Sequence, residues 1–177
     1  MIRTLLMATT LFAAACAAPY TLPADDRADI AARIAGFERA FLNGNTREIV
    51  NVVPPRMIAA IATDAGVSED LLRTEMAKLT RDAARDAEVV SFGMSLDSAE
   101  FLTTPTGRVY GLIPTQTVVR TPGGAQLQSS NQTLTLEDGG IWYLIRIDDA
   151  RQIDLMRQLY PDFKDVSFPE STSKVIG

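Results

Sequence analysis

The spacing of apolar residues changes once along this chain, and this change limits the fold more than any other sequence feature. In the first half, apolar side chains recur at helical spacing, as at Ile30, Ile34 and Phe37. From Glu88 onward apolar residues alternate with polar ones, as in a strand with one buried face. Helices followed by strands with short turns are typical of α+β proteins. We therefore expect N-terminal helices packed on an antiparallel sheet of four to five strands, followed by a C-terminal helix and tail.

Start and stop signals define the first two helical segments. Asp25 or Asp26 can cap the first helix, and Asn43-Gly44 ends it, because glycine readily adopts the left-handed turn that stops a helix. Asn45 and Glu48 have the spacing of a capping box and open a second segment.

Two prolines split this second segment. Pro54-Pro55 interrupts it, and we expect it to resume as a helix that ends at Gly66. Ser68 caps the next helix. The expected buried stripe of that helix consists of Leu72, Met76, Leu79 and Ala83.

The second half predicts an antiparallel meander. The expected strands span residues 90–96, 100–104, 108–119, 125–136 and 141–147. Pro114 marks a bulge or an edge position, because proline cannot donate to a sheet ladder. Asp138-Gly139 is a strong hairpin signal. Asp148 or Asp149 then caps a last helix, a role that we favour over a cation site.

One strand is unusual because it is polar on both faces. In the segment from 126 to 133, one face carries Gln126, Gln128, Ser130 and Gln132, and the other carries Ser129, Asn131 and Thr133. Such a strand either lies at a sheet edge or on a solvated face, or it lines a polar cavity. We favour the first alternative and keep the second open.

The N-terminus has the features of an export signal. Arg3 precedes an apolar stretch at residues 5–15, which is too short to span a bilayer. The residues before Cys16 resemble the lipobox of bacterial lipoproteins, in which small residues precede a cysteine that is acylated and becomes the mature N-terminus; Ala13 stands where leucine is usual. The alternative is an ordinary cut after Ala17.

This interpretation divides the chain into four parts. We expect a signal peptide at 1–15, a tether at 16–25, an α+β domain at 26–160 and an irregular tail at 161–177. Lipidation of Cys16 would attach the protein to a membrane. The residue after Cys16 is Ala17, as in lipoproteins that are sorted to the outer membrane. This resemblance implies that the domain lies on the periplasmic face of the outer membrane. The alternative location is the soluble periplasm.

Composition excludes several kinds of chemistry. The chain has no histidine and a single cysteine, so a histidine base, a thiolate zinc site and an internal disulfide are all excluded. We expect no cofactor and no metal. The net charge is −5 without a basic run, which argues against a nucleic-acid partner.

The layout resembles the nuclear transport factor 2-like, or cystatin-like, superfamily. The likeness depends on the Phe37/Phe41 helix, the meander from Val89 and the closing segment "DGGIWYLIRI". It implies a curved sheet with helices on its concave side around a cone-shaped pocket. Two features differ from many members: the helix and tail after the last strand, and the Pro54-Pro55 break.

The resemblance leaves two functional hypotheses. The leading one is a non-enzymatic binding or interaction module with a pocket for a small apolar ligand, or a face for an envelope protein or for a second copy of the chain. The expected pocket-lining residues are Tyr110, Asn131 and Trp142. Trp142 and Tyr143 should point to opposite faces of their strand, with one side chain buried and the other partly exposed. The alternative is an isomerase-like enzyme that uses Asp97 with Tyr110. The leading hypothesis assigns no catalytic residue.

Overall fold

The computed structural model describes residues 18–86 and 88–176. The expected signal peptide and Cys16 therefore lie outside the described residues. The helices are α1 (Ala24–Leu42), α2 (Thr46–Val50), α3 (Pro55–Ala65), α4 (Glu69–Asp86) and α5 (Ala150–Leu159), with 3-10 turns η1 (Leu96–Ser98) and η2 (Pro161–Phe163). The strands are β1 (Ala18–Pro19), β2 (Glu88–Met94), β3 (Glu100–Thr103), β4 (Val109–Arg120), β5 (Gln126–Asp138), β6 (Ile141–Arg146) and β7 (Thr172–Val175).

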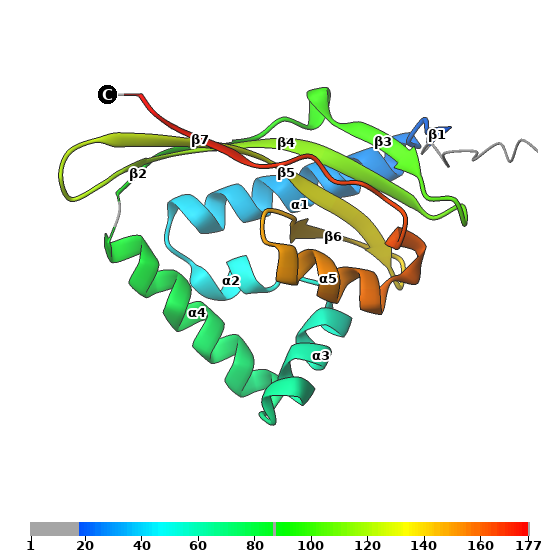
Figure 1. Cartoon of the computed structure of the whole chain (residues 1–177), viewed down its shortest axis with the longest axis horizontal. Helices are drawn as coiled ribbons and strands as arrows, with labels where there is room; N and C mark the ends of the chain where they lie inside the picture. Colours follow the sequence, from blue (N-terminus) through cyan, green and yellow to red (C-terminus); the bar gives the residue numbers. More distant parts are fainter. Residues whose placement is uncertain (1–17, 87, 177) are drawn as a thin grey trace, which may run out of the picture.

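This arrangement confirms the α+β fold, with helices first, a curved antiparallel sheet and a C-terminal helix (Figure 1). The five expected strands correspond to β2 through β6. The hairpin between β5 and β6 turns at Gly139 and Gly140, whose φ angles of 64° and 80° suit a two-residue type I′ turn.

The centre of the sheet is the long hairpin of β4 and β5. These strands pair without interruption from Tyr110 opposite Leu136 to Arg120 opposite Gln126. Each of these two strands is longer than the strands on its outer edge, so two short strands share each outer edge. β3 and β2 divide the outer edge of β4, and β6 and β7 divide the outer edge of β5.

Both edges change from one neighbour to the other at the same level of the sheet, which we call the waist. On β4, pairing with β3 ends at Leu112 and pairing with β2 begins at Thr115. On β5, β6 pairs from Thr133 and β7 pairs up to Ser130. Pro114 lies at the waist, where an absent N–H breaks no ladder bond, and its carbonyl oxygen accepts from the Ser95 N–H at 2.9 Å.

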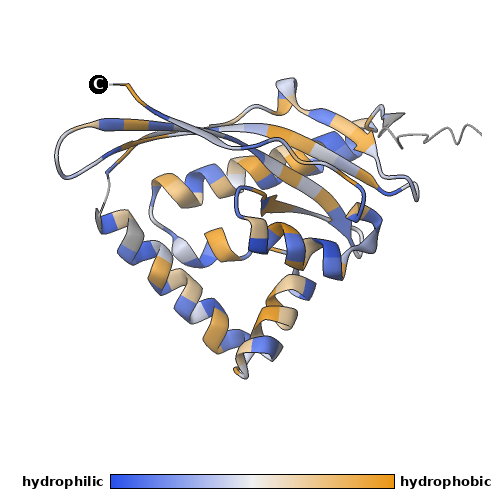
Figure 2. Cartoon of the chain, viewed as in Figure 1, coloured by the Kyte–Doolittle hydropathy of each residue, from blue (hydrophilic) through white to orange (hydrophobic). Residues whose placement is uncertain are grey.

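Helices cover both faces of the sheet. Strand alternation places Ile113 and Trp142 on the face under α1, which contributes Ile30 and Ile34 to that cluster. The opposite face carries a second cluster with α5 and the segment after it: Tyr110, Leu112, Leu134, Leu136, Ile145, Met156, Tyr160, Phe163 and Val166. The helices are amphipathic, and α3 and α4 meet at the end of the molecule farthest from the sheet (Figure 2).

Several expected caps are confirmed. The Asn45 side chain accepts from the Glu48 N–H, and Ser68 Oγ accepts from the Leu71 N–H at 3.2 Å. Gly66 ends α3 in the left-handed conformation, with a φ of 66°. Asp149 caps α5 by accepting from two backbone N–H groups.

Four local expectations were wrong. The N-cap of α1 is Pro23, so Asp25 and Asp26 lie in the first turn of that helix. Leu79 is 65% exposed because α4 packs on α2 and α3 only through the side that holds Leu72, Met76 and Ala77. A bulge shifts the pairing of β2 between Val89 and Ser91, which exposes Val90, and Leu96 lies in η1 instead of the strand. Trp142 and Tyr143 are both buried, because helices cover both faces.

Both ends of the described chain are tied to the sheet. Within the expected tether, Ala18 and Pro19 pair with β3, and the Tyr20 N–H donates to the Phe101 carbonyl oxygen at 2.8 Å. Within the expected irregular tail, η2 is followed by β7, which pairs with β5. No helix among the described residues is long and apolar enough to cross a membrane.

Replacement of Gly111 by alanine should destabilise the fold. An added Cβ would lie 2.6 Å from the Phe101 ring and 2.8 Å from Thr135 Cγ2, which is far inside van der Waals contact. We expect Gly111→Ala to lower the free energy of unfolding by about 1–3 kcal/mol, the usual cost of overpacking. Urea denaturation measures this change.

Gly93→Ala is the matched control, because a Cβ there meets nothing within 4 Å and the residue also lies in a strand. It should be neutral or slightly stabilising. Equal unfolding midpoints for the two variants would contradict the tight packing inferred at Gly111.

Candidate functional site

A hollow formed by the described residues lies at the waist. It is an open groove of about 870 Å³ between η1, the two central strands and the start of β7. It is lined by Gly93, Met94, Ser95, Leu96, Asp97, Pro114, Thr115, Gln116, Ser130, Asn131, Gln132, Pro169, Glu170 and Thr172. We call it the waist groove.

The groove exists because the sheet is narrow here and its face is not covered by α5. Pro114 pairs with Gln132 at the waist, and Gln116 pairs with Ser130 two residues farther along β4. By alternation these side chains lie on the α5 face of the sheet, beyond the apolar cluster that ends at Leu112. Gly93 lies on the same face with open space above it, so no side chain fills the floor.

Two amide oxygens near the waist are buried without a hydrogen-bond partner among the described residues. They are Asn131 Oδ1 and Gln132 Oε1. On the outer edge of β5, no strand in the described part of the chain pairs with either residue, because β7 ends opposite Ser130 and β6 begins opposite Thr133. Buried acceptors without partners cost stability, so these positions favour a donor from outside the described chain.

The charge of the groove is one-sided. Asp97 and Glu170 line it from η1 and from the segment before β7, and the lining includes no lysine or arginine. Asp97 is paired at 2.8 Å with Arg27, which lies outside the lining. The groove therefore offers acceptors and negative charge.

The three residues expected to line one pocket occupy three different places. Asn131 lines the waist groove. Trp142 lines a second hollow of about 410 Å³ between α1, α2 and β6, and its indole N–H donates to Asp26 at 3.2 Å. Tyr110 is 1% exposed and packs edge-on against Phe163 in the core, and it lines neither hollow.

The structure does not assemble Asp97 and Tyr110 as a pair. The Asp97 side chain is 99% exposed and bonded to Arg27. The Tyr110 ring is buried on the α5 face, where burial, with a smaller effect of Glu100, raises the pKa of its hydroxyl. A proton could not pass directly between these two groups.

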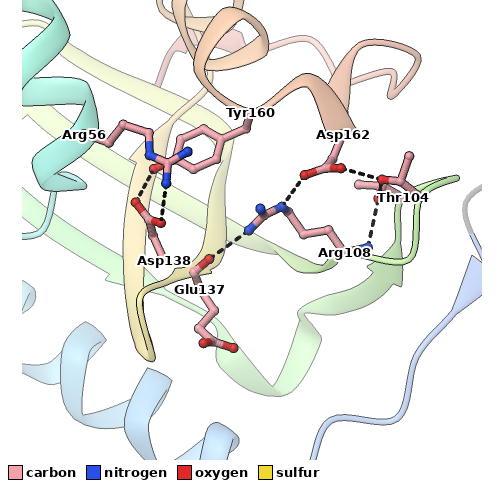
Figure 3. Close-up of polar contacts among 8 residues, drawn as sticks. Arg56, Thr104, Arg108, Glu137, Asp138, Tyr160 and Asp162 are labelled. Carbon is pink, nitrogen blue, oxygen red and sulfur yellow. Dashed lines mark hydrogen bonds and ion pairs between the residues drawn. The ribbon is translucent and has the colours of Figure 1, made fainter.

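A different tyrosine and aspartate do meet, at the other end of the sheet (Figure 3). The Tyr160 hydroxyl donates to Asp138 Oδ2 at 2.9 Å, and Arg56 bonds the other oxygen of Asp138 at 3.3 Å. The guanidinium groups of Arg56 and Arg108 lie over the Tyr160 ring, 5.3 and 5.5 Å from its centre. Arg108 also donates to Asp162 at 2.7 Å.

This cluster joins α3, the turn before β4, the end of β5 and the end of α5. Burial first, and then the hydrogen bond to Asp138, raise the pKa of the Tyr160 hydroxyl above its ordinary range, although Arg56 and Arg108 partly oppose the shift. Hydrogen bonds from Thr106 and Arg108 lower the pKa of Asp162. None of these residues lines either hollow, so we assign the cluster to stability.

Sequence reasoning missed most of the waist groove. Gly93 was one available signal, because a glycine inside a strand often marks an open or closely approached backbone. Pro169 and Glu170 gave no signal, since their place depends on the long-range pairing of β7 with β5. Gln132 belongs to the polar strand segment that we expected at a sheet edge or in a cavity wall. In the structure it lies in the groove wall, next to the gap between β6 and β7 on the edge of β5.

No cluster of three or more carboxylate or thiol groups that could hold a metal ion is present in residues 18–86 and 88–176. Asp149 is committed to capping α5, and Asp148 forms an ion pair with Arg146. These contacts support the cap that we expected at Asp148-Asp149.

Comparisons with known proteins give no relative: no family model, no curated protein and no solved structure matches this chain.

The stabilising effect of Asp162 should depend on pH. Its pKa is lowered in the folded state, so its charge stabilises the protein above its unfolded pKa, and this contribution disappears as the pH falls through the folded pKa. We expect Asp162→Asn to reduce the free energy of unfolding by about 1–2 kcal/mol at pH 7, since its partners are partly exposed. The difference from the parent should shrink below about pH 4.

Denaturation by urea at several pH values measures this profile. Asp154→Asn is the matched control, because Asp154 is an exposed carboxylate on α5. A loss at Asp162 that stays constant down to pH 2.5 would contradict an electrostatic origin.

Proposed function

We propose that this chain is a non-enzymatic binding module of the bacterial cell envelope. In this proposal the protein is exported, is anchored in the membrane through a lipid on Cys16, and holds a ligand in the waist groove. The export signal and the lipobox-like residues before Cys16 support the location. The groove is the single structural observation that supports the binding role.

The size and chemistry of the groove favour binding over catalysis. Its volume of about 870 Å³ falls within the usual range for small-molecule sites. Its lining contains no histidine, cysteine, lysine or tyrosine, so its acid–base groups are limited to Asp97 and Glu170. The apolar ligand expected from the layout fits poorly, because residues with amide, hydroxyl or carboxylate groups make up most of the lining.

The docked N-terminal segment adds a consequence for the anchor. Ala18 is already paired with Thr103 in β3. A lipid on Cys16 would therefore be separated from the sheet by about two residues, or roughly 7 Å of chain. The domain would then lie close to the membrane surface, and not at the end of the tether that we expected at residues 16–25.

The anchor is tested by the mass of the protein extracted from the membranes of a bacterial host that expresses the full chain. We expect a mature N-terminus at Cys16 with added acyl chains, and a Cys16→Ser variant without acylation. A mature chain that begins with an unmodified Ala18 would overturn the lipid anchor, although it would leave export intact.

The binding role is tested by native mass spectrometry of the same extracted protein. We expect a bound small molecule on the parent and its loss from Gly93→Phe, because a side chain at this position extends into open groove space without backbone strain. Gly93→Ala, which adds only one carbon, should retain it. A ligand equally retained by Gly93→Phe would place binding elsewhere.

A further inference from the structure

We propose that the ligand of the waist groove is a small organic cation with several N–H donors, of the linear polyamine class. This inference rests on the proposed function, because it names the ligand of the same groove. Four features of the described residues support it: the sign of the charge, the unsatisfied acceptors, the mixture of polar and apolar lining, and the open shape.

The first feature is charge complementarity. Glu170 is exposed at one wall of the groove, and no ion pair of its carboxylate is found in the described part of the chain. Asp97 at the opposite wall contributes a second carboxylate, partly neutralised by Arg27. An anion would meet repulsion here with no lysine or arginine in the lining to offset it, whereas an ammonium group is attracted from both sides.

The second feature is hydrogen bonding. The Gln132 side chain lies on the groove face of β5, and its buried Oε1 has no donor among the described residues. The hydroxyl oxygens of Ser95 and Ser130 and the Gln116 amide add further acceptors in the lining. An ammonium group donates up to three hydrogen bonds and accepts none, so it matches a site that is rich in acceptors.

The third and fourth features are the mixture of polar and apolar lining and the open shape of the groove. Pro114 and Pro169 place apolar surface beside the polar groups of the lining, whereas the Met94 and Leu96 side chains pack against the α1-face cluster. A polyamine has a similar mixture, because short methylene chains separate its nitrogens. The groove is open and runs from η1 to the start of β7, which suits an extended ligand better than a compact one.

Calorimetric titration of the purified full-length protein with spermidine tests the proposal. We expect saturable binding of one spermidine with a dissociation constant below about 1 mM, the weak end of specific affinities. Gly93→Phe should abolish it, although this variant leaves the net charge unchanged, so any remaining signal is non-specific attraction to an acidic protein. Circular dichroism and the urea midpoint check that Gly93→Phe is folded.

Two charge and acceptor variants test the contacts. Glu170→Gln should weaken spermidine binding about twofold to fivefold, in keeping with an exposed ion pair. Gln132→Leu should weaken it about tenfold, as expected for loss of an acceptor to a charged donor. The matched control is Glu75→Gln, which removes one exposed carboxylate from α4, outside the groove, and should leave the affinity unchanged.

Two further probes separate charge from hydrogen bonding. Hexamethonium is a linear dication without an N–H donor and is compared with putrescine, a linear dication with N–H donors. A neutral polyol such as glucitol has donors but no charge. We expect hexamethonium to bind at least tenfold more weakly than putrescine, and glucitol at least tenfold more weakly than spermidine. Equal binding of hexamethonium and putrescine would overturn the donor requirement, and equal binding of glucitol and spermidine would overturn the charge requirement.

The proposal is overturned if spermidine does not bind, if Gly93→Phe leaves its affinity unchanged, or if Glu75→Gln weakens binding as much as Glu170→Gln does. That result would leave the broader binding role intact as long as the extracted parent protein retains another molecule that Gly93→Phe loses. Absence of any retained molecule, with normal spermidine binding, would instead indicate a ligand that exchanges during purification and would support the polyamine assignment.

Discussion

The pairing of β4 with β5 is the constraint on which the rest of the structure depends. These two strands are the longest in the sheet and pair along their whole common length. Open edges of this length would expose rows of unpaired backbone groups and invite aggregation. The chain covers them with four shorter strands, two on each side, which draw on sequence as distant as Glu88 and Val175. The segment around β1 in turn covers the outer edge of β3.

Covering long edges with short strands leaves a gap where one neighbour ends and the next begins. Pro114 is placed in that gap because it needs no ladder partner for its nitrogen. On β5 the same gap leaves Asn131 and Gln132 without a neighbouring strand. The waist groove is thus a consequence of how the sheet is assembled. Its polar lining follows from the polar half of β5, which α5 and the segment after it do not cover.

Two regions of the sheet have different tasks. One end holds the cluster around Tyr160, in which Asp138 accepts from Tyr160 and Arg56 while Arg108 donates to Asp162, and these contacts tie α3 and α5 to the strands. The waist instead carries buried acceptors that have no partner among the described residues. Polar groups that satisfy each other specify a rigid core, whereas polar groups without partners favour a ligand. This contrast is why we assign stability to the cluster and binding to the groove, although the cluster contains the more chemically suggestive residues.

The sequence by itself determined the order of the elements, most helix caps and the strands β2 through β6, because apolar period and turn residues are local signals. It also indicated Pro114 and the polar run of β5 as irregular positions, and it excluded histidine and thiolate chemistry outright. Only the tertiary structure decided where these positions meet. The two-residue strand β1 and the four-residue strand β7 carry too little pattern to be recognised, since their conformation depends on edges that residues far along the chain provide. For the same reason the sequence placed Tyr110, Asn131 and Trp142 around one pocket, whereas strand alternation and the cover on both faces separate them into the core, the waist groove and the α1 side.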